Sequence, residues 1–307
     1  MTYQLAKLLP NPEMDPWVAE VNALPDLQRR IVFRRLVTDR KLSRFLYKYR
    51  SLTPVDPAKN DGSHFAPRSV ENLHDIMVRS LLRLSSPAEF NDPFDLAACM
   101  LVQGTPDQRR ARFVNYLRNN GVAEHELDEQ VHQYMRVPDD ELIKVLRASQ
   151  EAHRKTVGVI CFADDPRSIL MWSHYATTHA GVCLQFDRLA DLGTLINATP
   201  VDYKPDYPTV NWLDGFEDSL LTMLLRKYPC WSYEGETRII VMEQAGRYLS
   251  FRPSALSGLI LGCRADDRVL ALIESVLNRR EKAGLPPVKL WRAKQHEREY
   301  KIVLRRN

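Results

Sequence analysis

The sequence has no long apolar run and no close pair of cysteines. No stretch approaches 18 consecutive apolar residues, so we expect no membrane-spanning helix and no membrane partner. The five cysteines are spread along the chain without a CxxC pair, and their number is odd. Cysteines of this kind inside apolar segments such as "VGVICFA" and "GVCLQFD" indicate buried thiols in a reducing compartment, not a zinc or redox site.

The common short motifs of nucleotide and hydrolase sites are also missing. The chain has no GxxxxGK[ST], no HExxH, no GxSxG and no GxGxxG after an apolar strand. A P-loop NTPase, a helical zinc peptidase and an α/β-hydrolase are therefore not expected. The formal net charge is +4, which is mildly basic and leaves nucleic acid open as a partner without arguing for it.

The N-terminus is a poor match to a secretory signal. The segment "MTYQLAKLLPNPEMDPW" has one lysine, a short apolar run and early prolines. We expect a cytoplasmic protein, although a protein exported without a cleaved signal peptide would have the same features.

What the chain does contain is a mixture of short strands and helices. With 307 residues, of which 44% are hydrophobic, it has enough apolar material for a core. The strands and helices do not alternate strictly, which favours an α+β fold. We predict a single domain over 45–307, in which helices flank a curved mixed or antiparallel sheet. A helical insertion is expected at about 105–155, and an N-terminal helical extension at 1–44.

The segment "WSYEGETRI" carries the most conspicuous polar pattern. Residues two apart share one face of a strand, so Glu234, Glu236 and Arg238 would point the same way if a strand begins that early. Gly235 is equally consistent with a turn or bulge. The cluster could be an exposed ion pair worth about 0–1 kcal/mol. It could also be a pair of acceptors at the mouth of a cleft, able to hold ribose hydroxyls, bind a metal or act as a base.

Two further segments have both a structural and a functional interpretation. "MWSHYATTHAG" predicts a helix that is either packed in the core or directs His174 or Tyr175 into a pocket. His174 and His179 are five apart, which is not the spacing of a helical zinc pair. In the strand "LYKYRSL", Lys48 and Arg50 share a face that is either solvated or has the Arg50 guanidinium beside a phosphate-bearing ligand.

The turn "FNDPFD" is a third such segment. Asn and Asp side chains cap their own backbone, and the residue before proline is held extended. A metal interpretation would need Asp92 and Asp95 to be joined by an acid from elsewhere in the chain.

Four stretches in this order resemble a bacterial family, the domain of unknown function 2971. They are "YKYRSL", "FNDPFD", "CFADDPRSILMWSHYATTHAGVCLQFD" and "KYPCWSYEGETRI", and together they span roughly 45–265. The layout is also similar to that of small ADP-ribosyltransferase-type toxins, at the level of analogy. That similarity implies a split, curved sheet that clamps NAD. The Ser-Thr-Ser strand of one transferase branch is absent, and "LSSP" is only a loose counterpart.

The same similarity implies roles for individual residues. Arg50, with Tyr49 beside it, would contact the dinucleotide phosphates, because a guanidinium matches a pair of pyrophosphate oxygens. Tyr175 would stack on nicotinamide, with Trp172 on the same helix also on the cofactor side. Glu236 would bind the nicotinamide ribose and stabilise its oxocarbenium charge. Two further residues complete the expected site. Glu234 would be the outer acid that orients the acceptor, and His174 is a candidate acid/base or substrate contact.

The leading hypothesis is an NAD- or nucleotide-dependent transferase or glycohydrolase of toxin, effector or defence type. It needs no metal, and the sequence does not identify the acceptor macromolecule. One alternative is a metal-dependent nuclease that uses Asp92, Asp95, His174 and Glu236, with a basic helix at 29–44 on the phosphates. The other is a binding module without catalysis, in which the motifs determine the fold.

Overall fold

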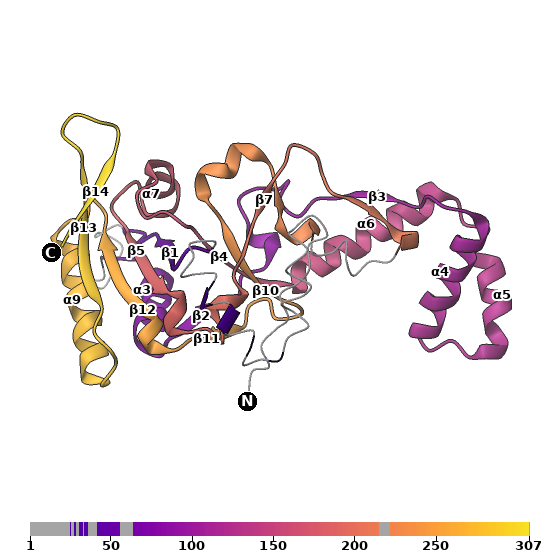
Figure 1. Cartoon of the computed structure of the whole chain (residues 1–307), viewed down its shortest axis with the longest axis horizontal. Coiled ribbons are helices and arrows are strands. Elements are labelled where there is room, and N and C mark those ends of the chain that lie inside the picture. The colour runs from indigo at the N-terminus through magenta and orange to yellow at the C-terminus, as the bar shows by residue number, and fades with distance from the viewer. Residues whose placement is uncertain are drawn as a thin grey trace.

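The computed structural model describes residues 42–55, 64–214 and 222–306, together with a few positions between 25 and 35. The chain has the α+β architecture predicted from its sequence, a mixed sheet flanked by helices within a single domain (Figure 1). The expected N-terminal extension at 1–44 lies largely outside the described residues.

The largest sheet has five strands in the order β1-β5-β12-β13-β14. β12 and β13 are parallel and are joined by a helix, whereas the other neighbours are antiparallel. The strands are β1 (Phe45–Arg50), β5 (Val182–Asp187), β12 (Leu256–Leu261), β13 (Lys289–Gln295) and β14 (Ile302–Arg306).

A second, antiparallel sheet has the order β4-β10-β6, and three two-stranded ladders pair β2 with β11, β3 with β8 and β7 with β9. The strands are β4 (Gly158–Phe162), β10 (Thr237–Val241), β6 (Thr199–Pro200), β2 (Leu81–Arg83), β11 (Tyr248–Ser250), β3 (Cys99–Leu101), β8 (Thr209–Asn211), β7 (Asp202–Tyr203) and β9 (Arg226–Lys227).

The two main sheets meet where the edge strand β1 passes the end of β4. Tyr47 and Ala163 exchange both backbone hydrogen bonds there, at 2.8 and 2.7 Å. Ala163 is the residue after β4, so beyond this single pair the two sheets diverge. The backbone groups are therefore satisfied at the junction while the space between the sheets stays open to side chains.

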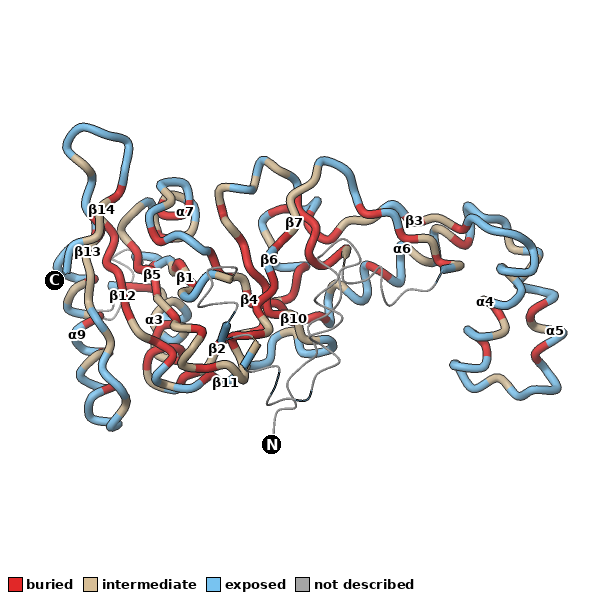
Figure 2. Tube along the Cα trace, in the orientation of Figure 1, coloured by how far each residue is buried: buried red, intermediate tan, exposed pale blue. Residues whose placement is uncertain are grey.

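Helices cover both faces of the five-stranded sheet. On one face, the main apolar core joins the sheet to α3 (Pro67–His74), the π-helical turn η2 (Asp75–Arg79) and α9 (Asp267–Lys282). On the other face, α7 (Ile169–Tyr175) packs through Met171 and Trp172 on a smaller core. Figure 2 shows the buried segments concentrated in this sheet-bearing body. The short helical turns are η3 (Pro87–Glu89), η4 (Arg188–Ala190), η5 (Leu195–Asn197), η6 (Trp212–Asp214), η7 (Pro229–Glu234) and η8 (Pro253–Ala255).

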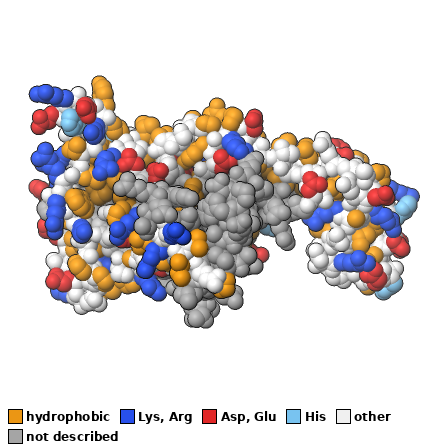
Figure 3. Space-filling view, viewed as in Figure 1, with side chains coloured by type: hydrophobic (Ala, Val, Ile, Leu, Met, Phe, Trp, Pro, Cys, Tyr) orange, Lys and Arg blue, Asp and Glu red, His pale blue; other side chains and the backbone are white. Residues whose placement is uncertain are grey.

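The helical insertion predicted at about 105–155 is present as α4 (Pro106–Asn119), α5 (Glu124–Tyr134) and α6 (Asp139–Thr156). Thr105 caps α4 in a capping box with Gln108. The tip of the insertion extends away from the sheets (Figure 1) and has its own apolar cluster. Its surface mixes charges of both signs (Figure 3), as in the pairing of Arg110 with Asp128. Over the described residues, we find no helix with both the length and the apolar character needed to cross a membrane.

Candidate functional site

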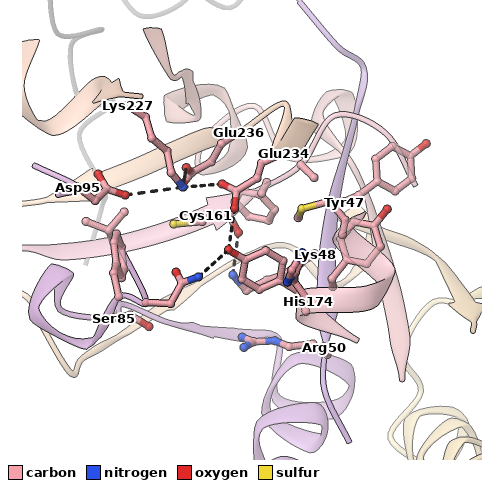
Figure 4. Close-up of a pocket in the computed structure, with 18 of the residues that line it drawn as sticks. Tyr47, Lys48, Arg50, Ser85, Asp95, Cys161, His174, Lys227, Glu234 and Glu236 are labelled. Atoms are coloured by element: carbon pink, nitrogen blue, oxygen red, sulfur yellow. Dashed lines mark hydrogen bonds and ion pairs between the residues drawn. The ribbon is translucent and has the colours of Figure 1, made fainter. Parts of the chain in front are cut away.

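A cavity of about 460 Å³ lies at the junction of the two main sheets (Figure 4). Its walls come from β1, β4, α7, the segment that contains "FNDPFD", and the segment that leads into β10. The residues that line it are Tyr47, Lys48, Tyr49, Arg50, Ser85, Glu89, Phe90, Asn91, Asp95, Val159, Cys161, Phe162, Ala163, Met171, His174, Tyr175, Lys227, Glu234 and Glu236. Six of the seven site residues expected from the sequence are among them, and Trp172 is the exception.

Strand β1 supplies two cations to this cavity. Lys48 Nζ donates to the backbone carbonyl of Cys161 at 2.8 Å and lies 5.4 Å from the centre of the Phe162 ring. Arg50 Nε is buried and has no hydrogen-bond partner. Within the described part of the chain, neither side chain is paired with a carboxylate. Burial, with no neutralising partner, lowers the pKa of Lys48 to about 7 and that of Arg50 to about 10.

The carboxylates lie on the other side of the cavity from Arg50 (Figure 4). Lys227 Nζ bridges them, at 2.5 Å from Glu234 Oε2 and 3.1 Å from Glu236 Oε2. Arg238 also binds Glu236, donating from Nε to Oε1 at 2.8 Å and from Nη2 to Oε2 at 3.0 Å. Both oxygens of Glu236 are therefore bound to cations, whereas only one oxygen of Glu234 is.

Arg238 ties this cluster to the "FNDPFD" turn. Its guanidinium makes a bidentate pair with Asp95, at 2.9 and 2.5 Å, and its side chain is 0% exposed. Three carboxylates thus share two cations, Lys227 and Arg238, which leaves one net negative charge. We call Asp95, Lys227, Glu234, Glu236 and Arg238 the buried ion network.

The network moves the pKa values of its two glutamates in opposite directions. Burial raises the pKa of Glu236, but the charges of Arg238 and Lys227 outweigh it and hold the pKa well below its usual range. Burial also raises the pKa of Glu234, and there the attraction of Lys227 does not outweigh it, so that pKa stays above its usual value. Glu236 is therefore the permanent anion, and Glu234 is the carboxylate that accepts a proton more readily.

Tyr175 connects the network to α7. Its hydroxyl donates to Glu234 Oε1 at 2.6 Å and accepts from Asn91 Nδ2 at 3.3 Å. Burial and the bond to Glu234 raise the pKa of the Tyr175 hydroxyl, so it remains a donor. Glu234 Oε1 therefore already accepts a hydrogen bond from a hydroxyl at the cavity wall. A ligand hydroxyl could donate to the same oxygen.

The geometry around Gly235 differs from the extended strand considered above. Pro229–Glu234 forms the turn η7, Gly235 is left-handed with φ 49°, and β10 begins only at Thr237. The turn interpretation is confirmed and the shared strand face is wrong. The exposed ion-pair interpretation is wrong as well, because Glu234, Glu236 and Arg238 are only 4%, 5% and 1% exposed.

We predict that Gly235→Ala destabilises the protein by about 1–3 kcal/mol and weakens any activity that depends on Glu234. A Cβ at this position would overlap the carboxylate of the exposed Asp164, which would have to turn away, and the left-handed backbone adds strain. The measurement is chemical unfolding of the variant beside Gly121→Ala. Gly121 also has positive φ, but no atom lies within 4 Å of its would-be Cβ, so that variant isolates the backbone term of about 1 kcal/mol. Equal losses in the two variants would contradict the steric argument.

Trp172 and Tyr49 form a support behind the cavity. Trp172 is 0% exposed, and its Nε1 donates to the Pro166 carbonyl at 2.8 Å. The two rings meet edge to face with centres 5.2 Å apart, and the Tyr49 hydroxyl donates to the Asp165 carbonyl at 2.8 Å. The structure therefore places Trp172 in the core, where it fixes α7 against β1, and not at the cavity surface.

A row of aromatic rings begins at the cavity wall with Tyr175 and His174. His174 is exposed, and its ring centre lies 6.0 Å from that of Tyr233 and 6.3 Å from that of Tyr175. Trp231 continues the row, 6.0 Å from Tyr233. Sequence reasoning did not single out Tyr233, Lys227 or Lys48 as site residues. Lys227 had a signal, because it stands two residues after the apolar run "MLL" and precedes the acidic motif.

The expected nuclease ligands do not form a metal site. Asp95 and Glu236 are both bound to Arg238, and Asp92 Oδ1 accepts the backbone N–H of Phe94 within its turn. Among the residues that the structure describes, no three His, Cys, Asp or Glu side chains are grouped so that they could hold an ion.

No family model matches the chain, and comparison with curated proteins and with solved structures gave no match either. The resemblance to the domain of unknown function 2971 accordingly rests on the four quoted stretches of sequence.

Proposed function

We propose that the cavity binds a nucleotide, with NAD as the first candidate, and that the protein is an NAD- or nucleotide-dependent transferase or glycohydrolase. One observation carries the proposal: a single cavity has two basic side chains, Lys48 and Arg50, on one wall, with no carboxylate partner among the described residues, and a buried carboxylate pair on another. A ligand that is anionic at one end and becomes cationic at the other during reaction fits this polarity.

Arg50 is the proposed phosphate contact. Its Nε has no partner, and its guanidinium faces a cavity, which is a costly arrangement for the protein alone. A phosphate or pyrophosphate would accept two parallel N–H bonds from the planar guanidinium and supply the missing charge. Lys48, two residues earlier on β1, adds a second positive group when it is protonated.

The rings at the cavity mouth are the proposed base site. The His174 ring centre lies 6.3 Å from that of Tyr175 and 6.0 Å from that of Tyr233. A nicotinamide or purine ring inserted beside them would gain stacking contacts of about 1–3 kcal/mol. Tyr175 has the further property that its hydroxyl reaches Glu234, so it links the base site to the carboxylates.

The two glutamates then take different parts in cleavage of the bond between nicotinamide and ribose C1′. As that bond breaks, its electron pair leaves with the nicotinamide nitrogen, and positive charge develops on C1′ and the ring oxygen. Glu236, ionised and fixed by Arg238, stabilises that charge without moving a proton. The acceptor hydroxyl or water attacks C1′, and its proton passes to Glu234, whose raised pKa suits a general base.

The acceptor decides which name the reaction takes. Water gives a glycohydrolase and a macromolecule gives a transferase, and the buried site accommodates either at C1′. A protein of toxin, effector or defence type is the biological class that this chemistry suggests. Nucleic acid stays among the candidate acceptors, because nothing in the cavity selects against it.

The test is nicotinamide release from NAD by the purified full chain, measured with a cell lysate as the acceptor source. We expect Glu234→Gln to lower the rate by about 10²–10⁴-fold, the usual contribution of a general base. Its amide keeps the shape and retains an acceptor for Tyr175. The control is Glu124→Gln on the helical insertion, which is exposed and should release nicotinamide at the unchanged rate.

Two results would overturn the proposal. One is the absence of both NAD binding and turnover in the folded wild-type protein. The other is turnover that is equal in the wild type and in Glu234→Gln. Either would favour the buried ion network as a determinant of the fold alone.

A further inference from the structure

Two lysines, the half-buried Lys48 and the buried Lys227, line the same cavity in opposite electrostatic settings. Lys227 Nζ lies within 4 Å of three carboxylates, those of Glu234, Glu236 and Asp95. Lys48 Nζ has one hydrogen-bond partner among the described residues, the neutral carbonyl oxygen of Cys161. An ammonium needs compensation for burial, and only Lys227 has it.

The charged groups around Lys48 reinforce the difference. Arg50, on the same strand and the same face, repels a second positive charge. The acid whose charge acts on Lys48, Glu236, is already held by Arg238 and Lys227. The Phe162 ring gives a weak attraction to a cation at 5.4 Å. The balance lowers the pKa of Lys48 to about 7, chiefly through burial and then through Arg50, whereas that of Lys227 is raised by its three carboxylates, which outweigh its burial.

From this contrast we infer that Lys48 is an amine nucleophile that forms an imine with a phosphate-bearing aldehyde bound in the cavity. A neutral amine needs a free lone pair, and the single bond to Cys161 uses an N–H and leaves that lone pair available. Arg50, two residues along β1, supplies the contact for the phosphate. The combination selects a small carbonyl compound that carries a phosphate group.

The reaction balances without a further reagent. The Lys48 lone pair attacks the aldehyde carbon, and the carbonyl π electrons move to oxygen, which takes up a proton as the nitrogen loses one. The resulting carbinolamine then loses its hydroxyl as water, and a carbon–nitrogen double bond forms. Nothing is oxidised or reduced, and one water is released for each imine.

The inference uses the same cavity as the proposed function, but it does not require that NAD be the ligand. If the function proposed above holds with water as the acceptor, the ribose carries a hydroxyl at C1′ and opens to an aldehyde on a phosphate-bearing chain, which is the class of compound that Lys48 would capture. Lys48 would then act on the product side of glycosidic cleavage.

The experiment is reductive trapping on the full-length protein. Pyridoxal 5′-phosphate serves as the aldehyde probe, borohydride fixes any imine, and peptide mass mapping locates the adducts. At pH 7.5 an ordinary exposed lysine is neutral in only about one molecule in 10³. We therefore expect at least about tenfold more adduct on Lys48 than on Lys227 or on the exposed Lys289. The yield on Lys48 should rise with pH, with a midpoint near 7.

Two variants make the result specific. Lys48→Met should lose the cavity adduct while exposed lysines label as before. Arg50→Met should reduce the preference of Lys48 for pyridoxal 5′-phosphate over pyridoxal, which lacks the phosphate. Circular dichroism of each variant checks that it is folded.

The inference is overturned if Lys48 in the folded wild type labels no faster than the exposed lysines, or if Lys227 labels as fast as Lys48. These outcomes are separate from the fate of the proposed function. Selective labelling of Lys48 without NAD turnover would support the amine site and exclude the proposed NAD reaction. NAD turnover without labelling of Lys48 would support the NAD reaction and exclude the amine site.

Discussion

Replacing Arg50 by methionine is expected to weaken the binding of NAD and of ADP-ribose by about ten- to a hundredfold, and to leave the protein as stable as before or more stable. A charged hydrogen bond to a phosphate contributes about 1.5–3 kcal/mol, which accounts for the loss of affinity. Arg50 Nε has no hydrogen-bond partner in the described chain, and the side chain pairs with no carboxylate there, so removing the guanidinium breaks no ion pair and relieves a desolvated charge. Residues retained for function at a cost in stability behave in this way.

Calorimetric titration and thermal unfolding of the same samples would measure both effects. Arg44→Met is the matched control, because Arg44 precedes β1, is 53% exposed and pairs with Asp187 at 2.7 Å. We expect that variant to keep its affinity and to change stability by no more than about 1 kcal/mol. A large loss of stability in Arg50→Met, or an unchanged affinity, would mean that Arg50 serves the fold instead of a ligand.

Replacing Arg238 by methionine is expected to lower the free energy of unfolding by about 3–5 kcal/mol. The change leaves Asp95 and Glu236 as buried carboxylates that share one cation, and removing one partner of a buried ion pair has a cost of this size. It also removes the bond that Arg238 Nη1 donates to the Leu224 carbonyl. Glu236 should lose its fixed position, so catalysis should fall together with stability.

Urea unfolding at pH 7 tests this prediction, with Arg110→Met on the helical insertion as the control. Arg110 is 49% exposed and pairs with the exposed Asp128, so its removal should change stability by about 1 kcal/mol or less. If Arg238→Met were no less stable than that control, the buried ion network would not be what holds the carboxylates in place.

The elements that follow from local sequence were the ones that could be predicted. The first helix of the insertion, α4, carries its own start signal at Thr105 and Pro106 and its end signal at Gly121, and β1 carries its alternation in "FLYKYR". Arg50, Tyr175 and Glu236 were expected around one cleft, and the structure places all three in the lining of one cavity. The order of the motifs, and the similarity to ADP-ribosyltransferase-type toxins that it suggested, implied this grouping.

The partners of those residues could not be read from the sequence, because they depend on contacts between distant segments. Asp95 and Arg238 are 143 positions apart. Their ion pair joins the "FNDPFD" turn to the acidic motif in the folded protein. The left-handed Gly235 replaced the expected strand face by a turn, and that turn is what buries Glu234. The charged partners of a lysine also come from distant segments. The contrast between Lys48 and Lys227 therefore appears only in three dimensions.

The central claim is that one ligand lies between the cationic strand β1 and the carboxylates of the buried ion network. A crystal structure of the protein grown with ADP-ribose tests it most directly. We expect phosphate oxygens of the ADP-ribose within hydrogen-bond distance of the Arg50 guanidinium, and its terminal ribose beside Glu234 and Glu236. Density for the ligand elsewhere, or an unoccupied cavity at saturating ADP-ribose, would contradict it.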